Sequence, residues 1–203
     1  MDHNLVNKNI FCLKNKVAVV TGGAGILGQE FCRGLLEFGA SVALVDLDEA
    51  RIDFACQKLK VDHGDRIKGF VCDVSDEKSV KKMKQSVEQQ LGVIDILHNN
   101  AASKTSNIKN FFDSVEDFTL EAWREVSSVN IDGMFLVARE IGSSMVSRGK
   151  GSIIQTSSIY GARGPDNSIY KNALYDGIAI STPAVYSATK AGVIGLTKYL
   201  ATY

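Results

Sequence analysis

The sequence has no excess of positive or negative charge, and it contains little proline. The 203 residues include 23 Lys or Arg and 23 Asp or Glu, so the formal net charge is zero. A balanced charge gives no indication of electrostatic binding to nucleic acid or to an anionic membrane, and we expect neither as a partner. With only 2 prolines and 45% hydrophobic residues, the composition excludes a disordered chain and is typical of a folded protein with a sizeable core.

Long apolar runs and clustered cysteines are also missing. No stretch of about 18 residues is uninterruptedly apolar, which predicts that no helix crosses a membrane. Residues 1–16 are polar and lack the apolar core of a signal peptide, so we expect a cytoplasmic protein. The four cysteines form no CxxC pair, and the three histidines are not spaced with them as ligands. We therefore expect reduced thiols and no metal.

Short apolar segments alternate with amphipathic ones along the chain. We predict strands at residues 16–20, 41–46, 66–74, 93–102 and 151–158, and helices at 28–39, 48–62, 76–92, 118–147 and from Pro183 onward. This alternation predicts an α/β fold with a doubly wound parallel sheet covered by helices on both faces. Ligands of such folds lie beyond the carboxyl ends of the strands. No repeat or linker interrupts the pattern, so we expect residues 1–203 to form one domain.

A glycine-rich turn joins the first strand to the first helix, and three of its glycines fit a dinucleotide-binding spacing. In "TGGAGILG" they are Gly22, Gly25 and Gly28, at three-residue spacing. Such a turn lets backbone N–H groups and a helix N-terminus approach a pyrophosphate, although tight strand–helix turns use glycine without a ligand as well. Asp46 ends the second strand, where a carboxylate can accept hydrogen bonds from an adenosine ribose. Together these features predict a dinucleotide-binding domain of the Rossmann type.

Asp46 also bears on the choice of dinucleotide. Its carboxylate would repel a 2′-phosphate, no Arg or Lys lies immediately beside it, and the following "DLDEA" adds negative charge. We therefore predict NAD rather than NADP. The alternative is that Asp46 only caps the next helix, for which Asp48 is the better candidate. Two further strand ends lie at the same edge: Asp73 can meet the adenine amino group, and the small residues of "NNAA" (99–102) leave room for the cofactor.

Seven motifs run in order across residues 16–200, namely "TGGAGILG", Asp46, "CDV", "NNAA", "VNIDGMF", "TSS" and "YSATK". In this respect the sequence resembles the short-chain dehydrogenase/reductase family, single-domain branch. The resemblance implies an NAD(P)-dependent oxidoreductase acting on a small molecule. The implied cofactor-binding residues are Thr21, Gly22, Gly25, Ile26, Leu27, Gly28, Asp46, Leu47, Asp73, Val74, Asn100, Ala101, Tyr186 and Lys190.

Two details depart from the pattern of that branch. The middle glycine of TGxxxGxG would fall at Ile26, whereas this chain has it at Gly25. The resulting TGxxGxxG is more similar to the extended branch of sugar-nucleotide enzymes. The turn after the fourth strand reads NNAA where NNAG is usual, which alanine tolerates because it is small.

The resemblance implies four catalytic residues, Ser158, Tyr186, Lys190 and Asn130. Tyr186 and Lys190 are four apart and so project from one helical face, although a Tyr–Lys pair at this spacing is usually a solvated surface pair. A phenol is a poor base at neutral pH, and a neighbouring ammonium stabilises its phenolate form. Tyr186 would take the proton of a secondary alcohol while hydride passes to the nicotinamide, or the reverse.

The resemblance gives the other catalytic residues supporting roles. Lys190 would also hold the nicotinamide ribose, and Asn130 would support the lysine through a water. Ser158 would bind the substrate oxygen. Ser158 fits the family's "SSxxG" spacing, with Gly161 three residues on, and Ser157 is the less suitable of the two serines.

The segment between the catalytic serine and tyrosine, residues 159–182, is much longer than in most relatives. A long loop in a compact domain is usually functional or disordered. Its aromatic and polar residues suit a hydroxyl-rich or charged ligand such as a sugar derivative. The alternative is a surface insertion without a function. The segment is similar to that of short-chain dehydrogenases found near bacterial surface-sugar and flagellin glycan genes.

Relatives continue past the lysine helix into further strands, so the resemblance implies a chain truncated at Tyr203. Such a chain would expose a sheet edge and apolar helix faces. The intact protein is expected to be a homo-oligomer, a dimer or a tetramer. Two other functions stay open at this point: a sugar-nucleotide epimerase or dehydratase with bound NAD, and a catalytically impaired cofactor-binding fragment.

Overall fold

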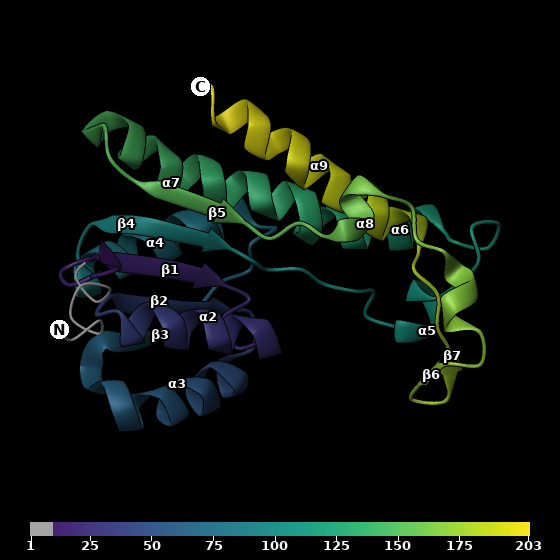
Figure 1. Ribbon diagram of the computed structural model, residues 1–203, viewed down its shortest axis with the longest axis horizontal. Helices are drawn as coiled ribbons and strands as arrows, with labels where there is room; N and C mark the ends of the chain where they lie inside the picture. Colours follow the sequence, from purple (N-terminus) through teal and green to yellow (C-terminus); the bar gives the residue numbers. More distant parts are fainter. Residues whose placement is uncertain (1–9) are drawn as a thin grey trace, which may run out of the picture. The chain divides into compact units, whose positions relative to one another are not determined.

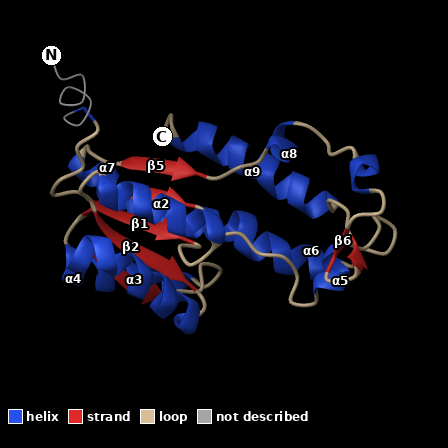
Figure 2. Ribbon diagram, turned by 60° about the horizontal axis from the view of Figure 1, so that its bottom comes forward, coloured by secondary structure: helices blue, strands red, loops and turns tan. Residues whose placement is uncertain are grey.

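The computed structural model describes residues 10–203. Its five-stranded sheet has the strand order β3-β2-β1-β4-β5. The strands are β1 (Val17–Thr21), β2 (Ser41–Asp46), β3 (Ile67–Val71), β4 (Ile94–Asn99) and β5 (Ser152–Gln155). β1 pairs in parallel with β2 and β4, and β2 pairs in parallel with β3, and Figure 2 shows β1 and β2 pointing the same way. The doubly wound parallel fold is therefore confirmed.

The described residues form two compact units. The first comprises residues up to Ala101 and Leu136–Ile154, and it holds almost all of the sheet. Its helices are α2 (Ile26–Glu37), α3 (Glu49–His63), the short 3-10 turn η1 (Gly64–Arg66), α4 (Glu77–Leu91) and most of α7 (Met134–Arg148).

β1 and β2 are apolar strands at the centre of this first unit. Every residue of β1 is buried, as are Val42–Val45 of β2. A parallel strand covered on both faces needs apolar side chains at consecutive positions, which is why the sequence shows runs of valine instead of alternation. One hydrophobic cluster joins side chains of these strands with those of α2 and α3, whose ribbons are labelled in Figure 1.

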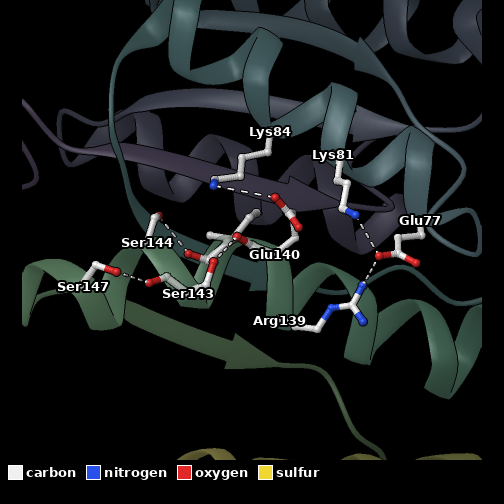
Figure 3. Close-up of polar contacts among 9 residues, drawn as sticks. Glu77, Lys81, Lys84, Arg139, Glu140, Ser143, Ser144 and Ser147 are labelled. Carbon is white, nitrogen blue, oxygen red and sulfur yellow. Dashed lines mark hydrogen bonds and ion pairs between the residues drawn. The ribbon is translucent and has the colours of Figure 1, made fainter.

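Helices α4 and α7 are connected by ion pairs, drawn in Figure 3. Glu77 accepts from Lys81 of its own helix at 2.9 Å and from Arg139 of α7 at 2.7 Å. A second pair, 3.7 Å long, joins Lys84 to Glu140. The hydrogen bond from Lys81, with both neighbouring positive charges, lowers the pKa of Glu77. Because Glu77, Lys81 and Arg139 are exposed, their pairs contribute little to stability and serve mainly to align the two helices.

The second unit comprises Ala102–Phe135 and Gln155–Tyr203. Its elements are α5 (Ile108–Phe111), α6 (Leu120–Ser127), the π-helical segment η2 (Ser128–Gly133), α8 (Ile159–Ala162), the 3-10 turn η3 (Asn167–Tyr170), the antiparallel pair β6 (Leu174–Tyr175) and β7 (Ile178–Ala179), and α9 (Ala184–Leu200). The long helix α9 contacts α6, η2 and α8. This packing is what holds the sequence-distant catalytic candidates in one unit.

The structure corrects the predicted helices in two places. The helix expected over 118–147 is interrupted by η2, because six residues there adopt π-helical turns between α6 and α7. The last helix is expected to begin at Pro183. Instead Pro183 itself occupies the N-cap position, with extended backbone (φ −72°, ψ 154°), and no side chain caps the helix.

The loop expected over 159–182 carries structure of its own. α8 and η3 lie in its first half, and the β6–β7 hairpin lies in its second half. The two residues between β6 and β7, Asp176 and Gly177, have φ values of 48° and 78°. Positive φ at both positions is the requirement of a type I′ hairpin turn, which Asp-Gly satisfies. Strands predicted to reach 74, 102 and 158 end earlier, at Val71, Asn99 and Gln155.

No helix within residues 10–203 is long and apolar enough to cross a membrane. In the same part of the chain, no group of three or more His, Cys, Asp or Glu side chains could hold a metal ion. The four cysteines are free thiols, and only Cys12 is exposed.

Candidate functional site

The glycine turn of the first unit leaves the N-terminus of α2 uncovered by side chains. Gly22 has φ +64°, and a Cβ on it would lie 2.9 Å from the Cα of Ala101. A Cβ on Gly28 would overlap the carbonyl oxygen of Gly22. Gly25 is the N-cap of α2 and offers no side-chain hydrogen bond to the first turn. Gly22 and Gly28 therefore admit no side chain, and the first N–H groups of α2 are left to an anion.

Thr21 and Asn100 join the ends of β1 and β4 next to this turn. The Thr21 hydroxyl donates to Oδ1 of Asn99 at 3.2 Å and accepts from the N–H groups of Asn100 and Ala101 at 2.9 and 3.0 Å. The Asn100 amide in turn donates to the Thr21 carbonyl at 3.1 Å. Thr21 is fully buried, so the structure places it as a support of the turn, with its hydroxyl turned to the protein.

Asp46 fixes the same turn from the end of β2. Its Oδ2 accepts from the N–H of Ala24 at 3.0 Å, and its Oδ1 accepts from the N–H of Leu47 at 2.9 Å. The helix cap that was the alternative role belongs to Asp48, which accepts from the N–H of Arg51. Arg51 also donates to the carbonyl of Ala24 at 3.3 Å, so a guanidinium lies beside the turn that Asp46 binds, which the sequence alone did not show.

The remaining predicted cofactor residues line the same strand ends. Oδ1 of Asp73 accepts from the N–H and hydroxyl of Ser75 at 2.8 and 2.6 Å, which orients the turn after β3, and Val74 beside it is buried. Ile26 is 87% exposed, and Leu27 and Leu47 are also exposed. Free N–H groups, a ribose acceptor and apolar side chains at one edge of the first unit fit a nicotinamide dinucleotide.

Lys190 lies in the second unit and is almost completely buried, at 2% exposure. Its Nζ donates to the carbonyl of Thr156 at 2.8 Å and lies 5.9 Å from the centroid of the Tyr186 ring. Burial lowers the pKa of Lys190 because it disfavours the ammonium form. An ammonium with one donor used has two left for other partners. The pair therefore joins a buried lysine to a half-buried tyrosine, unlike a solvated surface pair.

Ser158 and Tyr186 line one pocket of about 480 Å³ within the second unit. Ser158 caps the short helix α8, where its Oγ accepts from the N–H of Tyr160 at 3.1 Å. That bond occupies a lone pair and leaves the Ser158 hydroxyl proton available to a substrate oxygen. Ser157 does not line this pocket, and its hydroxyl donates to the carbonyl of Lys190 at 2.7 Å.

Gly161 explains the spacing of the serine motif. A Cβ on this residue would lie 2.6 Å from the carbonyl carbon and oxygen of Lys190. The glycine therefore lets α8 pack directly on α9, which brings Ser158 into the same pocket as Tyr186.

Asn130 lies in η2 and is fully buried. Its Oδ1 accepts from the N–H of Ser103 at 2.7 Å, and its Nδ2 donates to the carbonyl of the same residue at 3.2 Å. The two bonds hold the segment that follows the NNAA turn. The predicted water between Asn130 and Lys190 stays a prediction.

Sequence reasoning missed several residues of the pocket. They come from the segment after β4, from α5 and the residue after it, and from the end of the 159–182 segment: Ser103, Lys104, Phe111, Phe112, Ile180, Ser181 and Thr182. Tyr160, Tyr170 and Tyr175, which also line the pocket, are among the aromatic residues of the 159–182 segment that were expected to suit a polar ligand. The signals that could have found part of this set are the Asp-Gly turn, which predicts a hairpin over 174–179, and the position of Ser103 just past a strand end.

Comparisons with known proteins agree with this geometry. The family model for short chain dehydrogenases matches residues 16–173. D-threitol dehydrogenase of Mycolicibacterium smegmatis is 30% identical over 94% of this chain and 65% of its own length. The NADP-dependent mannitol dehydrogenase of Alternaria alternata is 31% identical over 96% of this chain and 67% of its own.

A solved structure shows the same fold. The crystal structure of an NAD⁺-bound xylitol dehydrogenase superposes with a TM-score of 0.78 at 28% identity, covering 94% of this chain and 67% of that one. The chain thus spans about two thirds of the length of these relatives. The matched family model and the relatives at 30% identity or more establish that the chain belongs to the short-chain dehydrogenase family.

Proposed function

We propose that the protein is an NAD-dependent oxidoreductase that transfers a hydride between nicotinamide and a secondary alcohol or ketone on a polar, sugar-like small molecule. The observation that carries this proposal is the pocket of the second unit, where Ser158 and Tyr186 meet and Lys190 is buried beside the phenol. Relatives whose printed names specify threitol and mannitol support a polyol as the substrate class.

Each catalytic side chain has a distinct task. Tyr186 takes the proton of the substrate hydroxyl at its phenolic oxygen, and it returns that proton when the reaction runs towards the alcohol. Ser158 donates a hydrogen bond to the substrate oxygen as negative charge develops on it. Lys190, oriented by the Thr156 carbonyl, stabilises the phenolate form of Tyr186. A bound nicotinamide dinucleotide supplies the hydride acceptor or donor.

Asp46 supports NAD as the preferred dinucleotide, whereas the positive charge of Arg51 would favour the 2′-phosphate of NADP. The Asp46 carboxylate is held by Ala24 and Leu47 at the ribose end, where it repels a 2′-phosphate. Arg51 reaches the same turn, where its guanidinium donates to the carbonyl of Ala24. NADH and NADPH titrations followed by fluorescence test this: NADH should bind at least tenfold more tightly, and Asp46→Asn should reduce that ratio.

The reaction type is tested by net reduction of NAD. Oxidation of a panel of polyols by the wild type, and its loss in Tyr186→Phe, would support the dehydrogenase. The Gly22-Gly25-Gly28 spacing favours one rival, an epimerase that keeps its NAD bound and shows no net NADH. Conversion of a sugar nucleotide without net NADH would support that rival, and cofactor binding with no turnover of any panel member would support an impaired fragment.

We also propose that the protein is a homo-oligomer. The proposal rests on its membership of the short-chain dehydrogenase family. Sedimentation equilibrium of the purified chain tests it, and a monomer at micromolar concentration would contradict it.

A further inference from the structure

The pocket of the second unit carries one positive charge and no negative one. Among its lining residues within the described chain, Lys104 is the only charged side chain, and none is Asp or Glu. Within residues 10–203, no carboxylate forms an ion pair with its ammonium. A cation in a pocket wall without a protein counter-ion is available to a ligand.

Two aromatic rings hold this ammonium at the pocket. Nζ of Lys104 lies 4.3 Å from the centroid of the Tyr175 ring and 5.7 Å from that of Phe112. Both rings line the pocket, and their own centroids are 6.1 Å apart. Cation–π attraction at these distances favours one position of a side chain that would otherwise move freely in water.

The backbone on both sides of this contact is also fixed. Ser103, the residue before Lys104, is bound through its N–H and its carbonyl to the buried Asn130. Tyr175 ends β6, and the Asp176-Gly177 turn pairs it with Ile178 of β7. Tyr175 of the β6–β7 hairpin and Lys104 of the segment after β4 therefore form one subsite of the pocket.

The rest of the pocket offers hydroxyl groups instead of charges. The Tyr160 and Tyr170 hydroxyls lie 3.0 Å apart, and Thr182 donates to the Tyr170 hydroxyl at 3.3 Å. Hydroxyl groups both donate and accept, so such a wall matches a ligand that carries several hydroxyls of its own. A pocket of about 480 Å³ is in the range that holds molecules of sugar size.

We propose that this pocket takes an anionic, hydroxyl-rich substrate whose carboxylate or phosphate binds the Lys104 ammonium above the Tyr175 ring. The secondary alcohol of the same molecule lies at Ser158 and Tyr186, with its other hydroxyls towards Tyr160 and Tyr170. The inference rests on the proposed function, because it names the substrate class of that reaction. Lys104 is thereby the residue that selects anionic over neutral polyols.

Calorimetric titration of the full chain with NAD present tests this selection. The probes are D-glucitol, D-glucitol 6-phosphate and D-gluconate, which are a neutral hexitol and two anionic relatives of it. At least one anionic probe should bind tenfold or more tightly than D-glucitol, as expected for a charge-assisted hydrogen bond. A preference for the phosphate or for the carboxylate identifies which anion the subsite takes. Raising the salt concentration should reduce the difference.

Lys104→Met removes the charge and keeps an apolar stem of similar length. We expect it to abolish the preference, so that neither anionic probe binds more than twofold more tightly than D-glucitol. The matched control is Lys109→Met, an exposed lysine of α5 that does not line the pocket. Equal affinity of the wild type for neutral and anionic probes, no binding of any probe, a preference that survives in Lys104→Met, or an equal loss in Lys109→Met would each overturn the proposal.

The titration separates this inference from the proposed function. Heat of binding needs no turnover, so charge selection can be observed in a protein that oxidises none of the probes. Conversely, a protein that binds NADH and oxidises neutral polyols with no role for Lys104 keeps its proposed function and loses only the anionic substrate.

Discussion

Replacing Lys190 with Met should remove most of the activity without unfolding the protein. Because Nζ of Lys190 lies 5.9 Å from the Tyr186 ring centroid, an effective dielectric constant of about 20 gives roughly 3 kcal/mol of stabilisation to a phenolate. That energy corresponds to about 100-fold in rate. We therefore expect kcat/KM of Lys190→Met to fall about 100-fold with any alcohol that the wild type oxidises.

Stability should change much less, for a reason that can be checked against pH. Burial lowers the pKa of Lys190, so between this lowered pKa and the ordinary lysine pKa of about 10.4 the unfolded chain binds more protons than the folded one. Native stability therefore rises with pH through this window. Met removes that dependence and the cost of burying the ammonium. It also leaves the Thr156 carbonyl without its donor, at a cost of about 1 kcal/mol.

Steady-state kinetics and urea unfolding measure the two effects on the same samples. Lys198→Met is the matched control, because Lys198 is an exposed lysine in the last turn of the same helix. The reasoning is refuted if Lys190→Met keeps more than a third of the wild-type kcat/KM, or if its activity is lost only in step with unfolding.

Three other predictions concern Gly161, Asn130 and the cysteines. Gly161→Ala should lower the free energy of unfolding by about 1–3 kcal/mol, because the new Cβ overpacks against Lys190. Gly164→Ala is the control, because Gly164 has open space around it. Thermal melts compare the two variants, and equal melting temperatures would contradict the close approach of Gly161 to Lys190. Asn130→Ala should cost about 1–3 kcal/mol by leaving both bonds to Ser103 unmade, as urea titration would show, and an unchanged midpoint would contradict it. Cys12 alone should react quickly with a thiol reagent in the native state, because burial raises the pKa of Cys32, Cys56 and Cys72; rapid labelling of any of these would contradict it.

The sheet could be predicted from the sequence because buried parallel strands leave a strong local signal. The valine runs of β1 and β2 mark strands that are covered on both faces, and Asp46 and Asn99 mark where two strands end. Each of these features depends on residues close together in the chain. The fold and the predicted strand positions were therefore right, with errors only at strand ends.

The pocket wall could not be predicted in the same way. η2 interrupts a segment whose apolar pattern is continuous, and its form depends on Asn130 binding a segment 27 residues away. The contact of Lys104 with Tyr175 joins a strand-end turn to a hairpin, and no periodicity links the two. The Asp176-Gly177 turn was readable, but it predicts only a hairpin and gives no indication of what the hairpin faces.

Comparison of Tyr186→Phe with the wild type tests the central claim most directly. The same preparation is titrated with NADH by fluorescence and assayed for NAD reduction by a polyol that the wild type oxidises. We expect NADH affinity within threefold of the wild type and kcat reduced by at least about 100-fold, since general acid–base catalysis by one side chain contributes 10²–10⁴-fold. A Tyr186→Phe protein that reduces NAD at more than a tenth of the wild-type rate would contradict it.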